Sequence, residues 1–479
     1  MGRFRGKYKR TRPLQCAVFQ AGFKGNLSMF RLLLIFTVVL ALAKPTLAAE
    51  STQPNIIVIF VDDLGYADLG CQGSKEVRSP RIDSIAANGV RCTAGYVTAP
   101  MCSPSRAGLL TGRYQQRFGY EFNLGAEFTL KAGLDVAQTT IADRLRAAGY
   151  ATGAIGKWDL GASPPYHPVK RGFDEFYGFL GGSRQHEPAT RDMGPYNTML
   201  RGRTPVKETD WSSDAYSKEA VAFVARHKDE PFFLYLSFTA PHWPMQAQAE
   251  DLALFADVPD LHRRTFLAMM SGLDRGVGRI LDAVREHALE ESTLIIFLSD
   301  NGGPTGPPRA APDAPFAYGQ NTSRNDPLRG VKGQLYEGGV RVPFLVQWKG
   351  NLPAGRVCDV PVSSLDITAT ALAVAGIEPD ESLDGVDFIP LLLGNADGER
   401  ALFWRVGGQS AVRLGEWKLV SRPGKPAELY NLDTDSGETT DLRDKQPEQL
   451  IDLREQLKNW SAGMERPRWS PRPFSRKKK

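Results

Sequence analysis

Two short apolar runs in the sequence end directly before side chains that carry oxygen ligands. They are residues 56–61, followed by Asp62 and Asp63, and residues 294–299, which end directly before Asp300 and Asn301. Three carboxylates held close together repel one another unless a cation lies among them. Oxygen ligands without histidine or cysteine favour calcium or magnesium over zinc. One such pair alone could simply cap the turn that follows, but two pairs after two runs favour a metal site.

A second candidate group lies around Cys102. The residues that follow it are typical of a helix start, since Pro104 suits the first turn and Gly112 suits the position after the last residue. Cys102 would then lie at a helix N-terminus, where free N–H groups favour anions. Arg106, one turn later, adds a permanent positive charge. The alternative is a buried, unreactive cysteine, which is the usual state of this residue type.

Two further apolar runs also end before polar residues. Residues 232–238 are followed by a loop that contains His242, and residues 151–156 are followed by Lys157 and Asp159. In open α/β sheets, ligands bind beyond the carboxyl ends of the strands. We therefore expect all of these side chains at one edge of one sheet.

The elements that must position these residues alternate along the chain. The apolar runs are short and rich in β-branched and aromatic residues, as buried strands are, and residues 344–348 form a fifth run. Helical patterns lie between them at residues 81–88, 140–148, 214–227 and 266–286. The sequence thus predicts an α/β fold with a large, mostly parallel sheet sandwiched by helices.

The C-terminal part follows a different pattern. Short strands separated by turns are predicted at residues 401–405, 411–420 and 428–432, followed by a helix over 447–460. This indicates a smaller antiparallel sheet with a helix. The predicted organisation is a leader over residues 1–49, a catalytic domain over 50–395, a C-terminal subdomain over 396–465 and a loose basic tail over 466–479.

The charge of the chain is unevenly distributed. Nine Lys or Arg residues and no acidic residue precede Glu50, so the remaining 50 basic and 54 acidic residues carry a charge near −4. This balance does not favour a nucleic-acid partner.

The leader resembles a secretory signal peptide. Its apolar run, residues 32–43, is shorter than the roughly 20 residues that span a bilayer, and small residues suit cleavage after Ala48 or Ala49. We expect export to the periplasm or the medium, with no stable membrane span after cleavage. An uncleaved N-terminal anchor is the alternative, and Met29 is an alternative start.

Several segments together resemble the sulfatase family. Cys102-Ser103-Pro104-Ser105-Arg106 resembles its Cys-x-Pro-x-Arg signature, and residues 149–159 resemble its second signature. Further similar segments follow in the family's order, at residues 55–65, 172–178, 240–242, 299–303, 328–343 and 428–432. The resemblance runs from about Asn55 to about Leu442, nearly the whole predicted mature chain.

The resemblance implies an alkaline-phosphatase-like core and two non-protein components. A calcium ion would be held by Asp62, Asp63, Asp300, Asn301 and an oxygen of the modified Cys102. In this family an enzyme oxidises the cysteine to formylglycine, so a formylglycine-generating enzyme is an implied partner.

The family also implies roles for the basic residues. Arg106, Lys157 and Lys332 would hold the aldehyde hydrate and the sulfate. His242 would contact the sulfate and assist the leaving oxygen. One hydroxyl of the hydrate would attack sulfur, and loss of the proton of the second would expel sulfate.

One position departs from the family pattern. The family usually has histidine after the Lys-Trp of the second signature, where this sequence has Asp159. That histidine is thought to take the proton from the second hydroxyl. Asp159 could serve as this base, or pair with Lys157 and leave the role to another group, or make a slow enzyme. Among the other histidines, His186 follows a glycine pair and is a candidate for the substrate pocket.

The preferred function is hydrolysis of sulfate esters on a sulfated carbohydrate or an aryl sulfate, similar to arylsulfatases and N-acetylgalactosamine-6-sulfatases. One alternative is a phosphate mono- or diester hydrolase of the same fold, but Cys102 with Arg106 argues against it. The other is a catalytically impaired binder of sulfated glycans, which Asp159 motivates and the intact set of metal ligands opposes.

Overall fold

The computed structural model describes residues 53–125, 128–189, 193–304, 322–378, 380–395 and 399–470. All the elements below belong to the compact unit Gln53–Lys479. The predicted leader and its cleavage site lie outside the described residues. Among the residues that are described, no helix has both the length and the apolar character to cross a membrane.

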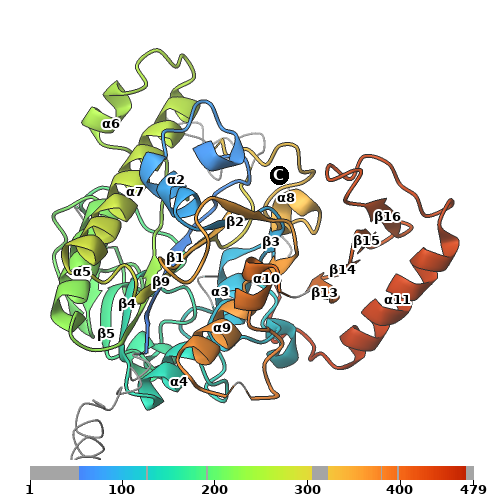
Figure 1. Ribbon diagram of the computed structural model, residues 1–479, viewed down its shortest axis with the longest axis horizontal. Helices are drawn as coiled ribbons and strands as arrows, with labels where there is room; N and C mark the ends of the chain where they lie inside the picture. Colours follow the sequence, from blue (N-terminus) through green and yellow to red (C-terminus); the bar gives the residue numbers. More distant parts are fainter. Residues whose placement is uncertain are drawn as a thin grey trace, which may run out of the picture. The chain divides into compact units, whose positions relative to one another are not determined.

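A large mixed sheet forms the centre of the described chain (Figure 1). Its strand order is β11-β2-β10-β9-β1-β8-β4-β5-β6-β7, and the five neighbours from β9 to β5 run parallel. The strands are β1 (Asn55–Val61), β2 (Val90–Cys92), β4 (Ala151–Lys157), β5 (Glu175–Phe179), β6 (Leu200–Arg201), β7 (Thr204–Pro205), β8 (Phe232–Ser237), β9 (Thr293–Ser299), β10 (Phe344–Gln347) and β11 (Arg356–Cys358). A separate short pair joins β3 (Gly95–Tyr96) to β12 (Val362–Ser363). The predicted mostly parallel α/β sheet is confirmed.

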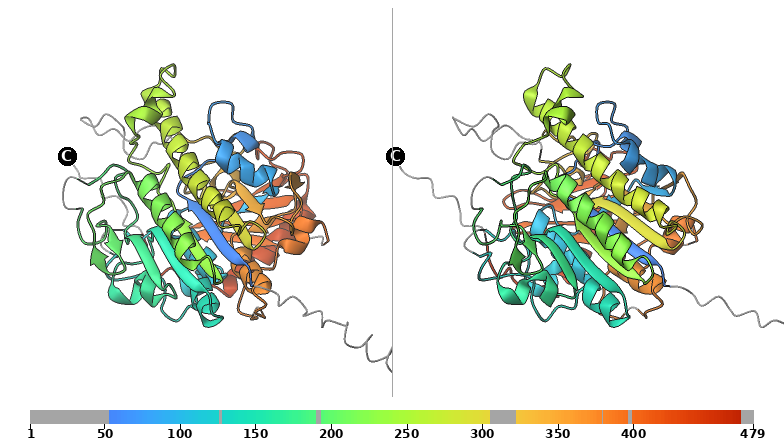
Figure 2. Two further views of the ribbon diagram at one scale, coloured as in Figure 1. Left: turned by 60° about the vertical axis from the view of Figure 1, so that its left-hand side comes forward. Right: turned by 90° about the vertical axis from the view of Figure 1, so that its left-hand side faces the viewer.

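Helices cover both faces of this sheet because its strands are apolar on both sides. In β1, Ile56, Val58 and Phe60 face one core, and the residues between them face the other. The first core receives α3 (Cys102–Thr111), α4 (Ile141–Ala147), α9 (Asp366–Val374) and α10 (Ile389–Leu393). The second receives α2 (Pro80–Ala87), α5 (Ser212–His227) and α7 (Leu261–Glu286). Figure 2 shows α5 and α7 side by side over that face.

Six further segments of regular structure are short. They are α6 (Ala249–Ala253), α8 (Glu337–Val340) and the 3-10 turns Gly70–Gln72, Gln115–Phe118, Pro164–Tyr166 and Pro168–Lys170. The helix predicted after Cys102 begins at that residue and ends at Thr111. Gly112 follows it with a φ of 65°, the left-handed conformation that suits glycine.

A four-stranded antiparallel sheet follows near the C-terminus. Its strands are β13 (Leu402–Val406), β14 (Gln409–Leu414), β15 (Trp417–Ser421) and β16 (Glu428–Asn431), and α11 (Pro447–Ala462) packs on it. The single strand predicted over residues 411–420 is wrong, because the chain turns at Gly415, with φ of 54°, to form the β14–β15 hairpin. Similar mixed stretches, with Arg413 on one side of the glycine and Lys418 on the other, concealed the turn.

Two residues of the predicted loose tail, Arg468 and Trp469, contact the rest of the chain. Trp469 is buried, and its ring meets Tyr120 edge-on at a centroid distance of 4.6 Å. Its Nε1 donates to the carbonyl of Phe122 at 3.0 Å. Arg468 forms an ion pair with Asp135 at 2.8 Å. The tail from residue 471 onward lies outside the described residues.

Candidate active site

The carboxyl ends of β1 and β9 bring three carboxylates together. Val61 of β1 pairs in register with Ser299 of β9, so Asp62 and Asp300 follow at the same edge of the sheet. The backbone N–H of Asp63 donates to Asp300 Oδ1 at 3.1 Å. One ligand atom from each of Asp62, Asp63, Cys102 and Asp300 lies within 4.8 Å of the others. The sequence analysis predicted that these side chains lie at one edge of the sheet, and the parallel register of β1 and β9 places them there.

Three basic side chains surround the carboxylates. Their closest ion pairs are Lys157 Nζ to Asp62 Oδ2 at 2.7 Å, Arg106 Nη2 to Asp300 Oδ2 at 2.7 Å, and Lys332 Nζ to Asp63 Oδ1 at 2.6 Å. Burial alone would raise the pKa of Asp62, but His242, Lys157 and Arg106 together hold that pKa well below its ordinary value. Asp62 therefore stays ionised, as a ligand of a cation must be.

Two buried oxygens in this group point to a missing partner. Asp62 Oδ1 and Asn301 Oδ1 accept no hydrogen bond from any described residue, although both are shielded from solvent. Asn301 uses its Nδ2 instead, which donates to Asp63 Oδ1 at 2.7 Å. Buried acceptors without a donor are uncommon and require an explanation. Oxygen atoms in a group of carboxylates fit a hard divalent cation such as calcium.

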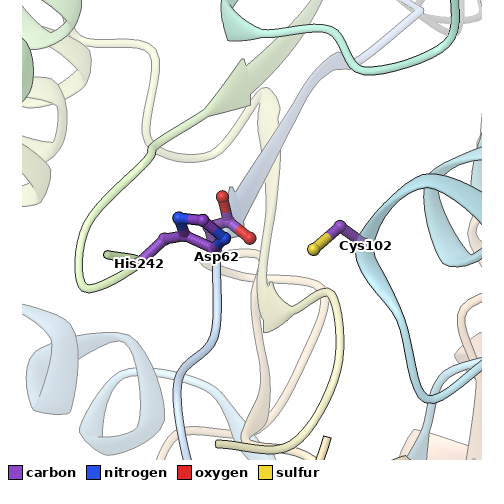
Figure 3. Close-up of side chains that lie close together, drawn as sticks. All are labelled: Asp62, Cys102 and His242. Carbon is purple, nitrogen blue, oxygen red and sulfur yellow. The ribbon is translucent and has the colours of Figure 1, made fainter. Parts of the chain in front are cut away.

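Cys102 faces this group from the first residue of α3. Figure 3 shows its sulfur directed toward Asp62, with the ring of His242 beside that carboxylate. Lys332 Nζ lies 3.1 Å from Cys102 Sγ. Burial raises the pKa of the Cys102 thiol well above its ordinary value, although Lys157 and Lys332 oppose the shift. The encoded thiol is therefore protonated near neutral pH and is a poor nucleophile.

The α3 helix is held by polar residues that the sequence did not single out. Arg106 is fully buried and donates to Ser237 Oγ at the end of β8. The N–H of Ser103 donates to Asn123 Oδ1 at 3.1 Å, which satisfies one free donor of the helix start. Tyr120 and Ser103 share a hydrogen bond of 2.6 Å. Of the partners of α3, only Ser237 was marked in the sequence, as a serine within the apolar run of residues 232–238.

Asp159 lies at the same edge but in a constrained backbone conformation. Its φ is 56°, uncommon for a residue other than glycine, and Ser103 Oγ donates to its carbonyl at 2.6 Å. Its carboxylate lies 3.7 Å from Lys157 Nζ. Burial raises the pKa of Asp159, and the charge of Lys157 opposes that rise. A carboxylate with a raised pKa is a better proton acceptor than an ordinary one.

His242 follows β8 and reaches the carboxylates. Its Nε2 lies 3.7 Å from Asp63 Oδ2, and its Nδ1 donates to the carbonyl of Trp243. With Nδ1 carrying a hydrogen, Nε2 bears a proton only when the ring is cationic. Burial lowers the pKa of His242, whereas Asp62 and Asp63 raise it.

His186 lies behind the backbone of His242. It is buried, its Nε2 donates to the carbonyl of His242 at 2.8 Å, and its Nδ1 accepts from Ser212 Oγ at 3.0 Å. Burial lowers the pKa of His186 to about 4, so the ring is neutral. Both ring nitrogens are engaged, and the bond to the His242 carbonyl helps to hold the His242 loop in place. The contact of His186 with substrate stays a prediction.

Comparisons with known proteins cover most of the chain. Residues 54–377 match the family described as Sulfatase, and residues 331–463 match the C-terminal part of N-sulphoglucosamine sulphohydrolase. N-acetylgalactosamine-6-sulfatase of Canis lupus familiaris is 32% identical over 404 residues, covering 78% of this chain and 72% of that protein. Arylsulfatase A of Homo sapiens is 34% identical over 428 residues, covering 81% and 77%.

A solved structure extends the likeness to three dimensions. The crystal structure of Ps i-CgsB in complex with k-i-k-neocarrahexaose has a TM-score of 0.81 and 36% sequence identity, covering 87% of this chain and 95% of that one. The expected alkaline-phosphatase-like architecture is confirmed by this likeness and by the strand order.

Proposed function

The chain belongs to the sulfatase family and is a sulfuric ester hydrolase, and from this premise we propose that it removes sulfate from a sulfated carbohydrate, using a formylglycine made from Cys102 and a bound calcium ion. The observation that carries the proposal is the grouping of Cys102 with three carboxylates and three basic side chains at one sheet edge. The names of the relatives support the substrate class, since they include a hexosamine sulfatase and a protein solved with a carrageenan fragment.

Calcium would be held by Asp62, Asp63, Asp300 and Asn301, together with an oxygen at position 102. The two oxygens without hydrogen-bond donors support this assignment. When bound, calcium offsets the carboxylate charge and lowers the proton affinity of an oxygen that it contacts. The phosphate-ester alternative shares this fold, but the Cys102–Arg106 signature favours sulfate.

Cys102 supplies the nucleophile only after conversion by a formylglycine-generating enzyme. The hydrated aldehyde would provide two hydroxyl groups on one carbon, one to attack sulfur and one to lose its proton afterwards. The high pKa of the buried thiol supports this requirement, because the unmodified side chain is not ionised.

The basic side chains would bind the sulfate and orient it. Lys332 and Lys157 are the cations that approach Cys102, and Arg106 fixes Asp300 and the position of α3. Positive charge placed beforehand stabilises the charge that develops on the sulfate oxygens during transfer. Lys332 and His242 would also contact the substrate directly.

His242 would protonate the departing oxygen in its cationic form. Because Nδ1 is committed to the Trp243 carbonyl, Nε2 can give up a proton only from the imidazolium. Turnover should therefore fall as pH rises through the pKa of His242, which burial lowers.

Asp159 would take the proton from the second hydroxyl. Its raised pKa and its place beside Lys157 support this role. Asp159→Asn keeps the shape and removes the base, and general bases contribute roughly 10²–10⁴-fold to turnover. We expect Asp159→Asn to lose at least 10²-fold in kcat and Asp159→His to retain more. Full turnover in Asp159→Asn would assign the base elsewhere.

We further propose that residues 1–49 direct export, and that residues 50–395 and 396–465 form the catalytic domain and the C-terminal subdomain. The basic, acid-free composition of the first segment and the two separate sheets support these boundaries.

The direct test compares Cys102→Ala with Cys71→Ala, a cysteine outside the site, in protein made together with a formylglycine-generating enzyme. Hydrolysis of a chromogenic aryl sulfate should disappear in Cys102→Ala and persist in Cys71→Ala. Sulfatase activity that survives in Cys102→Ala would contradict the proposal. Chelator-resistant hydrolysis of an aryl phosphate that exceeds that of the sulfate would favour the phosphate-ester alternative.

A further inference from the structure

A hollow of about 520 Å³ lies between residues next to the candidate active site and the turns of the C-terminal sheet. We call it the Phe122 hollow, after the half-buried ring in its wall. Its other defining residues are Met101 and Gly333 from the catalytic part of the chain, and Gly408, Arg422 and Lys425 from the β13–β16 sheet. This volume lies within the usual range of small-molecule pockets, about 300–1,000 Å³.

Two residues that line the hollow are chain neighbours of residues in the candidate active site. Met101 directly precedes Cys102, and Gly333 directly follows Lys332, whose Nζ lies 3.1 Å from Cys102 Sγ. The N–H of Gly333 donates to the carbonyl of Pro100 at 2.8 Å, which joins these two segments. The segments that carry Cys102 and Lys332 therefore also contribute to the wall of the hollow.

The lining of the hollow suits an anionic sugar. Phe122 and Met101 give apolar surface, and the glycines leave room beside it. Arg422 is already paired with Glu428 at 2.6 Å. Lys425 is exposed and forms no ion pair with the residues that the structure describes, so its charge is available to a ligand.

Hydrogen bonds and a buried ion pair hold Phe122 and the C-terminal sheet in place around the hollow. The carbonyl of Phe122 accepts from Trp469 Nε1, and the buried Trp404 Nε1 of β13 donates to the carbonyl of Val97 at 2.7 Å. Lys418 of β15 is buried against Glu337 at 2.8 Å. The sheet that carries Lys425 is thus fixed against the segment that carries Cys102.

We propose that the Phe122 hollow binds the sugar unit next to the one that carries the scissile sulfate, with Lys425 contacting an anionic substituent on that unit. This inference rests on the proposed function. It assigns the substrate class as an anionic oligosaccharide rather than an isolated sulfated sugar. A sulfate or a carboxylate on the neighbouring unit would satisfy Lys425 equally.

The test measures how sulfated oligosaccharides compete with a chromogenic aryl sulfate in the modified enzyme. The probes are hexasaccharides from carrageenan, which carry sulfate alone, and from chondroitin sulfate, which carry sulfate and carboxylate, with their desulfated forms as controls. An exposed ion pair contributes modestly, so Lys425→Ala should weaken inhibition by roughly two- to fivefold. Lys425→Glu should weaken it by roughly tenfold, because it reverses the charge.

Lys458→Glu on α11 is the matched control, since that lysine is exposed on the helix covering the other face of the same sheet. It should leave both inhibition and aryl sulfate hydrolysis as in the unaltered protein. In Lys425→Glu, the change in oligosaccharide inhibition should exceed any change in the KM of the aryl sulfate.

Three outcomes would overturn the inference: equal inhibition of the unaltered protein and Lys425→Glu, equal weakening in Lys458→Glu, or no inhibition by either sulfated hexasaccharide. Calorimetric binding of the same hexasaccharides to Cys102→Ala, with and without Lys425→Glu, separates this inference from the proposed function. Loss of all aryl sulfate turnover contradicts the proposed function. Binding that is unaffected by Lys425→Glu contradicts the role of the hollow.

Discussion

Lys418 provides a demanding test of how the C-terminal sheet is attached. Its side chain is fully buried on β15, with Nζ 2.8 Å from Glu337 Oε1 and 3.0 Å from Glu438 Oε1. Tyr96 donates to the other oxygen of Glu337 at 2.6 Å. At such distances the attraction in each ion pair is about 6 kcal/mol before desolvation, with an effective dielectric constant of about 20. Two buried carboxylates thus share the charge of Lys418, and Arg341 adds a second cation 3.3 Å from Glu337 Oε2.

Lys418→Met removes that charge while keeping most of the side-chain volume. Breaking a buried ion pair from one side costs about 3–5 kcal/mol, because a charge is left without a partner. We expect a loss of that size in the free energy of unfolding at pH 8. Lys458→Met, on the exposed surface of α11, should stay within about 0.5 kcal/mol of the unaltered protein.

The loss of unfolding free energy in Lys418→Met should depend on pH, because Glu438 titrates near neutral pH. Burial raises the pKa of Glu438 to about 7, and Lys418 opposes the rise. The folded state then keeps a proton that the unfolded chain has lost above its ordinary pKa of 4.5, so this group lowers stability as pH rises from about 4.5 to 7. Without Lys418 the pKa rises further, and the decrease should continue above pH 7.

Urea unfolding followed by tryptophan fluorescence at pH 6 and pH 8 measures both effects. The deficit of Lys418→Met should be larger at pH 8, and adding Glu438→Gln should recover part of it. A deficit below about 1 kcal/mol at pH 8, or one that is the same at both pH values, would refute the reasoning.

Three further outcomes can be measured. Calcium at 100 times its Kd should raise the free energy of unfolding of chelator-treated protein by about 2.7 kcal/mol, and Asp300→Asn should lose most of that gain in a thermal-shift titration. Trp469→Ala should cost about 1.5–3 kcal/mol in unfolding experiments, because the indole buried against Tyr120 is lost; an unchanged midpoint would contradict the observed packing. His186→Ala should lower kcat more than it changes KM by releasing the carbonyl of His242, and His186→Gln, whose amide can donate to that carbonyl, should restore part of the loss.

The parallel sheet and its polar edge could be predicted from the sequence, because each depends on the pattern of residues within a short segment. The apolar run of β1 and the two aspartates after it lie within nine residues, Asn55–Val61 and Asp62–Asp63. Once strands run parallel, their carboxyl ends must meet, so Asp62 and Asp300 were expected together despite 238 positions of separation. The same reasoning placed Cys102 at a helix start.

Contacts between segments far apart in the sequence could not be predicted in this way. Nothing near Trp469 in the sequence indicates that its indole packs on Tyr120, 349 residues earlier. The support of His242 by His186 arises from a hydrogen bond between two loops. The hairpin at Gly415 was missed because its turn is short and similar residues lie on both sides of it. The contacts of Trp469 and His186 share one cause, since each is decided by a distant partner segment, whereas Gly415 was a local turn signal that the prediction did not use.

The state of residue 102 tests the central claim most directly. Peptide mass spectrometry of the segment that contains Cys102, from protein made in its native host, should find a residue about 18 Da lighter than cysteine, from exchange of the thiol for an aldehyde. The peptide that contains Cys71 should retain the mass of ordinary cysteine. An unmodified Cys102 in protein that actively hydrolyses sulfate esters would contradict the proposed nucleophile.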